Sequence, residues 1–391
     1  MVEPSQYLPT ISSSEVPRLV QLITQAFNAP IADEQLYVER VGLENFRGLQ
    51  RGEQLVGALA VYPMGQWFGG QCLPIAGLAA VCVAPEHRGT GVAREMLTQT
   101  LRSFYHQGIP LATLYASTQR LYRGVGFEQA GTFCRLSVPT IALTQQSREL
   151  PISLLETTDW RVLYSLYQQQ AIVCNGNLER HEAIWDRIVD PPDTKVFVYL
   201  LGSDSAPEGY VVFRQENNQG KYDLRVRDWV ALTPKAHRSL WTFFADHRSM
   251  VDRVHWFGPL LNPTVALLEE HRYQIEHLER WLVRVVQVPK ALALRGYPLG
   301  VEAELHLAID DPLIPENSGR WQLQVSQGQG QVIPGGRGDV QMSIRGLAPL
   351  FTGLITPQIL QRLGFLEGTP EGLGTAAQLF AGPEPWMADH F

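Results

Sequence analysis

The chain has 391 residues, of which 45% are hydrophobic and 18% are charged, and its formal net charge is −7. This composition is typical of a soluble globular protein, and the acidic balance argues against nucleic acid as a partner. No segment reaches the ~20 apolar residues of a membrane helix, and the N-terminus "MVEPSQYLPT" lacks the basic start and apolar core of a signal peptide. We therefore expect no membrane partner and a cytoplasmic location.

The length indicates two or three domains, since domains usually contain about 100–200 residues. Cysteines are few and are scattered without the spacing of metal ligands, and most lie in apolar, strand-like segments. We expect reduced thiols and no metal site. The cysteines are Cys72, Cys82, Cys134 and Cys174.

Residues 1–145 have the pattern of a mixed α/β unit. The pattern predicts, in chain order, a helix over 14–28, three strands within 54–85 that break at 63–65 and at the Gly69-Gly70 pair, a helix over 92–106, a strand over 111–117, a short helix near 121–122 and a strand over 131–139. Strands on both sides of helices favour a layered α/β sheet.

The segment "VCVAPEHRGTGVAREML" (81–97) passes from a strand through a glycine-spaced turn into a helix. Small residues at this junction let backbone N–H groups approach a ligand closely, and the helix N-terminus adds a partial positive charge. Arg88 can add a donor fork for a pyrophosphate. The same glycines also occur in tight turns for structural reasons alone. Neither G-x-G-x-x-G nor G-x-x-x-x-G-K-[ST] occurs here.

This segment resembles the acetyl-coenzyme A motif [QR]-x-x-G-x-[GA] of the GNAT superfamily of N-acetyltransferases, with Arg88, Gly91 and Ala93 at the defining positions. The resemblance implies acetyl-coenzyme A as co-substrate, no metal, and a thioester carbonyl bound by backbone N–H groups of residues 81–83. The cofactor-binding residues that it implies are Val81, Cys82, Val83, Arg88, Gly89, Thr90, Gly91, Val92, Ala93 and Ser117.

The segment "YASTQRLYRGVGFEQAG" (115–131) is similar to the strand–helix–strand element of the same superfamily. The resemblance implies that Tyr122, which precedes the Gly126-Phe127 pair, is the general acid. The alternative for Tyr122 is an aromatic residue on a short amphipathic helix that packs into the core.

The remaining chain carries two further patterns. "VRDWVALTPKAHRSLWTFFADH" (226–247) repeats the strand–Pro–His-Arg–helix pattern with Ser239, Leu240 and Trp241 in place of the glycines, and 260–285 repeats 116–138. We interpret this part as a second GNAT-like fold that has lost its cofactor site. The short strands "AELHLAID", "GRWQLQVSQG" and "DVQMSIRG" resemble a sterol carrier protein-type domain. The fold class expected is α/β (α+β): tandem GNAT folds with mixed central sheets (1–145 and 146–287), then a small α+β domain (288–391).

Over its whole length this arrangement is similar to the Eis-like (enhanced intracellular survival) acetyltransferases. The resemblance implies a homo-oligomer, a hexamer, that acetylates primary amines by direct attack in a ternary complex. It also implies that the C-terminal carboxylate, here on Phe391, is catalytic, although a plain C-terminal anchor is an alternative. Aminoglycosides, polyamines and lysine-type amines are possible acceptors, although Ala29 stands where an acidic residue is expected for cationic sugars. The rival function is a non-catalytic acetyl-coenzyme A-sensing or apolar-ligand-binding assembly protein.

Overall fold

The computed structural model describes residues 4–28, 30–144, 147–156, 159–192, 194–203 and 205–391. The chain forms two compact units, the first made of Met1–Gly131, Trp281–Pro383 and Phe391, and the second of Thr132–Arg280 and Glu384–His390. The boundary expected between 145 and 146 lies outside the described residues, and the three expected domain ranges stay a prediction.

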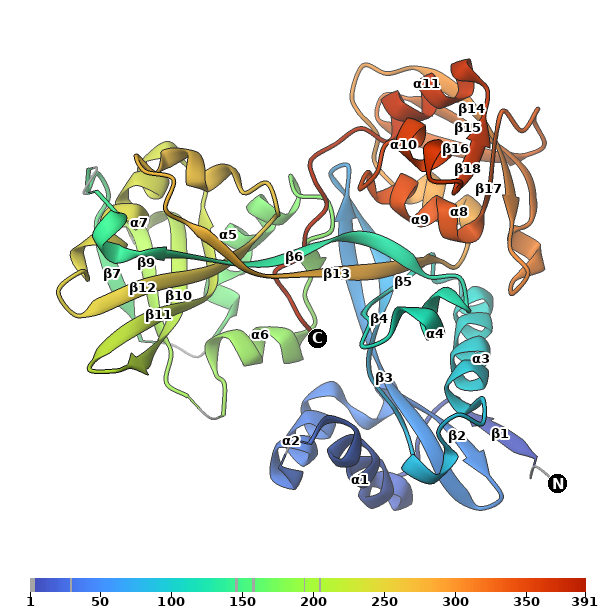
Figure 1. Ribbon diagram of the computed structural model, residues 1–391, viewed down its shortest axis with the longest axis horizontal. Coiled ribbons are helices and arrows are strands. Elements are labelled where there is room, and N and C mark those ends of the chain that lie inside the picture. Colours follow the sequence, from blue (N-terminus) through green and yellow to red (C-terminus); the bar gives the residue numbers. More distant parts are fainter. Residues whose placement is uncertain (1–3, 29, 145–146, 157–158, 193, 204) are drawn as a thin grey trace. The chain divides into compact units, whose positions relative to one another are not determined.

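The N-terminal part of the first unit is a mixed sheet with helices (Figure 1). Its strands follow the order β1-β2-β3-β4-β5-β13. Strands β4 and β5 run parallel, while residues 281–285 of β13 pair antiparallel with β5. The elements are β1 (Ser5–Leu8), α1 (Val16–Phe27), α2 (Ile31–Val41), β2 (Phe46–Arg51), β3 (Gln54–Phe68), β4 (Gln71–Val83), α3 (Val92–Gln107), β5 (Leu111–Tyr115), α4 (Gln119–Arg123) and β13 (Gln274–Val285).

The segment 54–85 forms two long strands, so the expectation of three was wrong. Gly69 and Gly70, with φ of 60° and 80°, make the expected hairpin turn between β3 and β4. Pro63, where a break was expected, lies inside β3 opposite Ala76. Because β2 pairs with β3 only as far as Ala60, the proline does not interrupt that ladder and the strand continues.

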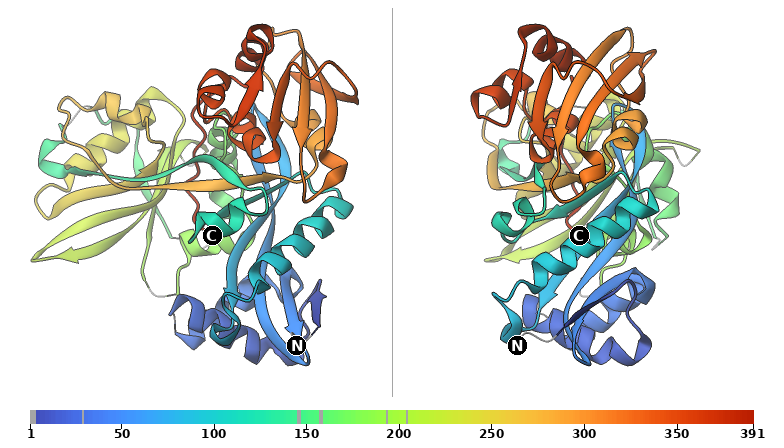
Figure 2. Two further views of the ribbon diagram at one scale, coloured as in Figure 1. Left: turned by 45° about the vertical axis from the view of Figure 1, so that its right-hand side comes forward. Right: turned by 90° about the vertical axis from the view of Figure 1, so that its right-hand side faces the viewer.

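The C-terminal part of the first unit is a five-stranded sheet with helices, seen from two further directions in Figure 2. The strand order is β16-β15-β14-β17-β18, and β14 and β17 are parallel. The short strands expected between Gly and Pro turns are confirmed. The elements are α8 (Val288–Leu294), β14 (Ala303–Asp310), β15 (Gly319–Ser326), β16 (Gln329–Pro334), β17 (Val340–Ser343), α9 (Ile344–Thr352), α10 (Pro357–Arg362), β18 (Leu366–Gly368) and α11 (Pro370–Leu379).

The second unit repeats the strand–helix–strand arrangement of the first. Its sheet order is β6-β12-β11-β10-β9-β7, and β11 and β12 are parallel and are joined through α7, as β4 and β5 are joined through α3. Over the described parts of the chain, no helix is long and apolar enough to cross a membrane. The elements are β6 (Glu128–Pro139), β7 (Ile152–Leu155), α5 (Arg161–Ala171), β8 (Leu178–Glu179), α6 (Glu182–Val189), β9 (Phe197–Ser203), β10 (Ala206–Asn218), β11 (Lys221–Ala231), α7 (Pro234–Asp246) and β12 (Val251–Gly258).

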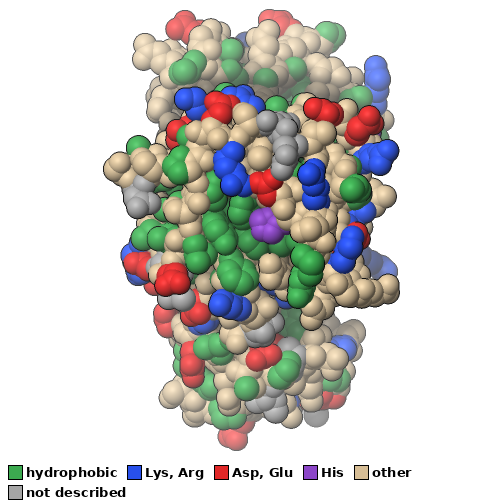
Figure 3. Space-filling view, turned by 90° about the vertical axis from the view of Figure 1, so that its left-hand side faces the viewer, with side chains coloured by type: hydrophobic (Ala, Val, Ile, Leu, Met, Phe, Trp, Pro, Cys, Tyr) green, Lys and Arg blue, Asp and Glu red, His purple; other side chains and the backbone are tan. Residues whose placement is uncertain are grey.

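Part of the surface of the second unit is apolar. Ile141, Val173 and Leu261 expose 79%, 69% and 79% of their surface. Figure 3 shows one face of the molecule on which hydrophobic side chains gather, with several Lys and Arg side chains beside them. Single exposed apolar residues are normal, whereas a group of them on one face indicates a surface that can associate.

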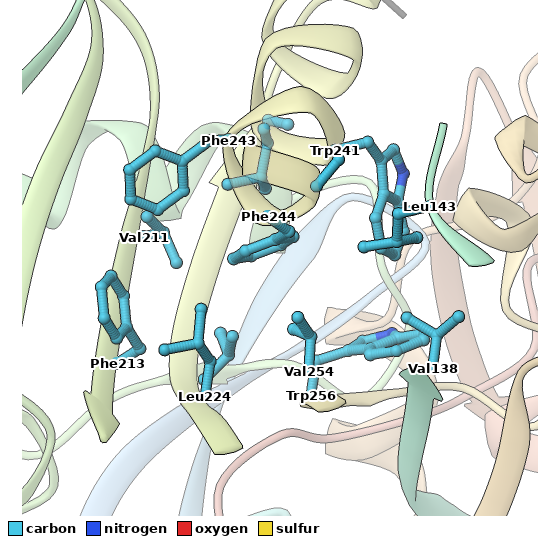
Figure 4. Packing of buried hydrophobic residues seen from close by; sticks show 14 of the residues in the cluster. Val138, Leu143, Val211, Phe213, Leu224, Trp241, Phe243, Phe244, Val254 and Trp256 are labelled. Atoms are coloured by element: carbon cyan, nitrogen blue, oxygen red, sulfur yellow. The ribbon is translucent and has the colours of Figure 1, made fainter. Parts of the chain in front are cut away.

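The core of the second unit lies between α7 and its sheet. Figure 4 shows Trp241 and Phe244 of α7 above Leu224, Val254 and Trp256 of the strands. The Trp241 and Trp256 rings meet edge to face, with centroids 5.5 Å apart. Burial of these large side chains makes this layer a stable support for the sheet.

Candidate active site

The turn between β4 and α3 has the geometry that backbone recognition of phosphate requires. Gly89 and Gly91 have φ of 76° and 90°, a conformation that L side chains rarely adopt, and a Cβ atom at either residue would meet nothing within 4 Å. Gly91 is the N-cap of α3, and no side chain caps this end. The first backbone N–H groups of α3, including those of Val92 and Ala93, have no partner within the helix. Open space and N–H donors without an intrahelical partner therefore coincide at this helix N-terminus, and they fit a pyrophosphate.

Arg51, at the end of β2, holds this turn in place. Its guanidinium donates to Thr90 Oγ1 at 2.9 Å and to the Thr90 carbonyl at 3.2 Å, and Thr90 Oγ1 in turn donates to the His87 carbonyl at 2.7 Å. The hydroxyl of Thr90, expected at the cofactor, is thus engaged within the turn. Arg88 is exposed, and its Nε donates to the Val83 carbonyl at 3.4 Å. Sequence reasoning missed Arg51, because neither its burial nor its contact with Thr90 can be read from the sequence.

The second half of β4 leaves its neighbouring strand. The parallel ladder with β5 covers residues 75–78 only. On the β3 side, Ala58 pairs with Cys82 and Ala60 pairs with Ala79, so two residues of β4 lie opposite one of β3 in a β-bulge, and Ala80 takes a φ of 48°. Residues 81–83 therefore lie on an arm of β4 whose backbone groups are not used by β5. A carbonyl oxygen or an amide chain can bind to such an arm.

Cys82 on this arm is not a nucleophile. Its thiol is buried and donates to the Ala58 carbonyl at 3.5 Å. Burial raises the pKa of the Cys82 thiol to about 12, so the thiolate is absent near pH 7. This favours direct transfer over an acyl-cysteine intermediate at this position.

Tyr122 on α4 is buried, with 4% of its surface exposed, and its ring meets that of Phe127 edge to face at 5.9 Å. Within the described residues its hydroxyl makes no hydrogen bond. Burial raises the pKa of Tyr122 to about 12. The ring therefore packs in the core, as the structural alternative expected, yet the hydroxyl keeps its proton and has a free hydrogen-bonding capacity.

A buried ion pair fixes the chain that follows α4. The Arg284 guanidinium lies against Gly126, where a Cβ atom would come within 2.7 Å of Nε, and it donates to the Val125 carbonyl at 3.1 Å. It also binds both carboxylate oxygens of Asp311 at 2.7 Å. Arg284 and Asp311 are fully buried, so this pair holds the turn behind Tyr122.

The C-terminal residue packs on the same sheet. The Phe391 ring meets Tyr62 of β3 and Tyr115 of β5 edge to face, at centroid distances of 5.8 and 6.1 Å. Its Cε2 atom would lie 2.8 Å from a Cβ placed on Gly77 of β4, so this glycine leaves the space that the ring fills. In the part of the chain that is described, no side chain forms an ion pair with the Phe391 carboxylate.

The structure thus brings most of the expected residues to the C-terminal ends of two neighbouring parallel strands. The glycine turn follows β4, while the exposed Ser117 and α4 with Tyr122 follow β5. Ligands of α/β sheets bind at such strand ends. Ala29 lies outside the described residues. The carboxyl group of nearby Glu34 is buried, and its pKa is raised first by burial and second by the negative charge of Asp33.

The corresponding turn of the second unit is closed. Helix α7 begins at Pro234, which has no N–H group, and the side chain of Thr233 accepts from the Ala236 N–H at 3.1 Å and caps the helix. Ser239, Leu240 and Trp241, expected in place of the glycines, lie further along α7 and are buried, so that detail of the expectation was wrong. The N-terminal donors here are capped or absent, which disfavours a second phosphate site.

No group of three or more His, Cys, Asp or Glu side chains that could hold a metal ion occurs among the described residues.

Comparisons with known families and proteins agree with this geometry. Residues 9–130 and 176–285 each match an acetyltransferase (GNAT) domain, and residues 288–388 match a sterol carrier protein domain. A crystal structure of a GCN5-related N-acetyltransferase from Anabaena variabilis is 43% identical, with a TM-score of 0.97 over 99% of this chain and 100% of that one. Another, from Kribbella flavida, is 29% identical, with a TM-score of 0.88 over 100% and 99%. The N-acetyltransferase Eis of Mycobacterium tuberculosis is 28% identical over 72% of this chain and 71% of its own length.

Proposed function

Because the chain belongs to the GCN5-related N-acetyltransferase (GNAT) family, with two GNAT domains and a sterol carrier protein domain, we propose that it transfers the acetyl group of acetyl-coenzyme A to a primary amine by direct attack in a ternary complex. That it is an acetyltransferase of the Eis type follows from the comparisons. An aminoglycoside, polyamine or lysine-type amine is the proposed acceptor.

The observation that carries this proposal is the open turn at Gly89 and Gly91. The N–H groups of Val92 and Ala93, with Arg88, would bind the pyrophosphate, and residues 81–83 on the free arm of β4 would bind the chain that leads to the thioester. Acetyl-coenzyme A supplies an activated acetyl group when bound. Backbone donors on the arm would stabilise the charge that develops on the carbonyl oxygen.

The acceptor must attack as a neutral amine. For an amine of pKa about 10.4, removing the proton at pH 7 costs about 4–5 kcal/mol. A carboxylate of pKa about 3.5 is too weak a base to do this alone, because the mismatch of about seven pKa units corresponds to ~9 kcal/mol. We assign the Phe391 carboxylate the role of holding the ammonium group, whose proton then leaves through water.

The Tyr122 hydroxyl acts as a hydrogen-bond donor in this proposal. Its pKa of about 12 exceeds that of a thiol, about 8.5, so complete proton transfer to the leaving thiolate is uphill by ~5 kcal/mol. A hydrogen bond to the developing thiolate carries no such penalty and uses the one free polar group of this side chain. Tyr122 thus stabilises the leaving group more than it protonates it.

A homo-oligomer, specifically a hexamer, in the cytoplasm remains part of the proposal. The face in Figure 3 on which hydrophobic side chains gather supports association, since apolar surface of this kind is usually covered in an assembly. The rival function, a non-catalytic acetyl-coenzyme A-sensing or apolar-ligand-binding assembly protein, is not proposed, because similar proteins are named N-acetyltransferases.

The experiment is turnover of acetyl-coenzyme A, followed as release of free thiol, with a panel of aminoglycosides, polyamines, lysine peptides and arylamines. Deletion of Phe391 should lower kcat sharply for the best acceptor. Phe391→Leu is the matched control, since it keeps a C-terminal carboxylate at the same chain length, and it should retain most of the activity. Equal activity of the deletion variant and the wild type would remove Phe391 from the proposal, and absence of turnover with every amine would refute the acceptor class.

A further inference from the structure

The second unit contains a cavity of about 350 Å³ between α6, the β10–β11 pair and residues 388–390. Its apolar part includes Phe133 and Phe257, whose rings stack with centroids 4.9 Å apart, and Ile184 and Ile188 of α6. Cavities that bind small molecules have volumes of about 300–1,000 Å³ and a mostly apolar lining with a few polar groups. The polar lining here is dominated by arginines: Arg135, Arg187, Arg214, Arg225 and Arg227.

The carboxylates of this cavity are already paired. Glu216 forms an ion pair with Arg225, and it lies 3.5 Å from Arg214. Asp389 is buried and binds the Nε of Arg180 at 2.9 Å. Arg180 itself does not line the cavity, and it also binds Asp228 at 2.6 Å. Arg225 also lies 3.7 Å from Asp223 and 4.0 Å from Glu276, which do not line the cavity, so the uncompensated positive charge lies on other arginines of the lining.

Arg135 and Arg187 carry that excess. Both are exposed, and neither forms an ion pair with a carboxylate of the described residues, while Arg187 interacts with Asp389 only electrostatically, beyond ion-pair distance. Arg187 donates only to the His390 carbonyl, at 3.4 Å, so the rest of its donor fork is unused in the described structure. Planar guanidinium groups bind phosphate or carboxylate oxygens through charge-assisted hydrogen bonds, and here they lie in the same cavity as apolar side chains.

We propose that this cavity binds a small organic anion, in which a phosphate or carboxylate contacts Arg135 and Arg187 and an aromatic or aliphatic body contacts Phe133 and Phe257. The excess of positive charge repels polycationic amines, so the ligand class differs from the acceptors proposed above. The inference stands on the second unit alone and does not depend on acetyl transfer.

Isothermal titration calorimetry tests the proposal on the full chain at low salt, with phenyl phosphate as the probe and inorganic phosphate and benzyl alcohol as its polar and apolar halves. Phenyl phosphate should bind more tightly than either half. Arg135→Gln and Arg187→Gln should each weaken its binding by about tenfold or more, since a hydrogen bond to a charged group is lost. Arg248→Gln, which alters an exposed arginine of the same unit outside the cavity, should leave the affinity unchanged.

Absence of binding, equal affinity for phenyl phosphate and inorganic phosphate, or equal losses in all three variants would overturn the proposal. The apparent affinity should also fall as sodium chloride is raised, because screening weakens exposed charge pairs. Since the measurement involves no acetyl-coenzyme A, its failure leaves the proposed acetyl transfer unaffected, and failure of acetyl transfer leaves this result unaffected.

Discussion

Replacing Tyr122 with Phe separates its packing from its chemistry. The substitution keeps the buried ring and its edge contact with Phe127 and removes a hydroxyl that makes no hydrogen bond within the described residues. The free energy of unfolding should therefore stay within about 1 kcal/mol of the wild type, since no partner is left unpaired. The loss of one preorganised donor to a developing charge typically lowers kcat by about 10²–10³-fold, or ~2.7–4 kcal/mol. We expect that loss for Tyr122→Phe in the thiol-release assay.

Tyr297→Phe is the control with the opposite expectation. The Tyr297 hydroxyl is buried and donates to the Leu292 carbonyl at 2.6 Å, so its removal leaves that carbonyl unsatisfied and should lower the free energy of unfolding by about 1–3 kcal/mol. The rate should not change. Thermal unfolding and steady-state kinetics of both variants together test the reasoning. It would be refuted if Tyr122→Phe retained wild-type kcat, or if it lost activity only in proportion to lost folded protein.

Three further predictions concern the same site. Gly91→Val forces a branched side chain into a φ of 90° and should raise KM for acetyl-coenzyme A at least tenfold, whereas Gly108→Ala at the other end of α3, with a φ of 74°, should affect stability alone. Arg284→Leu leaves Asp311 buried without its ion-pair partner and should lower the free energy of unfolding, measured by urea denaturation, by about 3–5 kcal/mol; wild-type stability would contradict the assigned pair. The pKa of Tyr122, about 12, lies above the working range, so its hydroxyl stays protonated from pH 7 to 10. The value of kcat/KM should therefore rise as the acceptor amine loses its proton and should show no decline due to Tyr122. A decline of kcat/KM at high pH that is present in the wild type and absent in Tyr122→Phe would contradict this.

The strand–turn–helix core of the first unit could be predicted from sequence because its signals are local. Glycine spacing at 89–91 marks positive φ at a helix start, and the helix expected over 92–106 forms at Val92–Gln107. The expected break at Pro63 failed because a proline interrupts a strand only where its missing N–H is needed by a partner strand. Whether a backbone N–H points toward a partner strand depends on the pairing of the whole sheet and cannot be read from the sequence of the strand.

The supports of the site could not be predicted because they depend on partners far away in the chain. Arg51 contacts Thr90 across 39 positions, and Arg284 contacts the Val125 carbonyl across 159. A buried arginine has no sequence pattern that names its acceptor. The same holds for strand pairing, since residues 281–285 of β13 complete the sheet beside β5. Only local motifs and the resemblance to a family place such residues near a site in advance.

Amide hydrogen exchange with and without acetyl-coenzyme A tests the central claim most directly, because the proposed binding groups are backbone N–H donors. We predict that acetyl-coenzyme A slows exchange in peptides covering residues 81–93 and leaves peptides covering 226–241 of the second unit unchanged. Unchanged exchange over 81–93, or protection confined to 226–241, would contradict the assignment of the acetyl-coenzyme A site to the turn between β4 and α3.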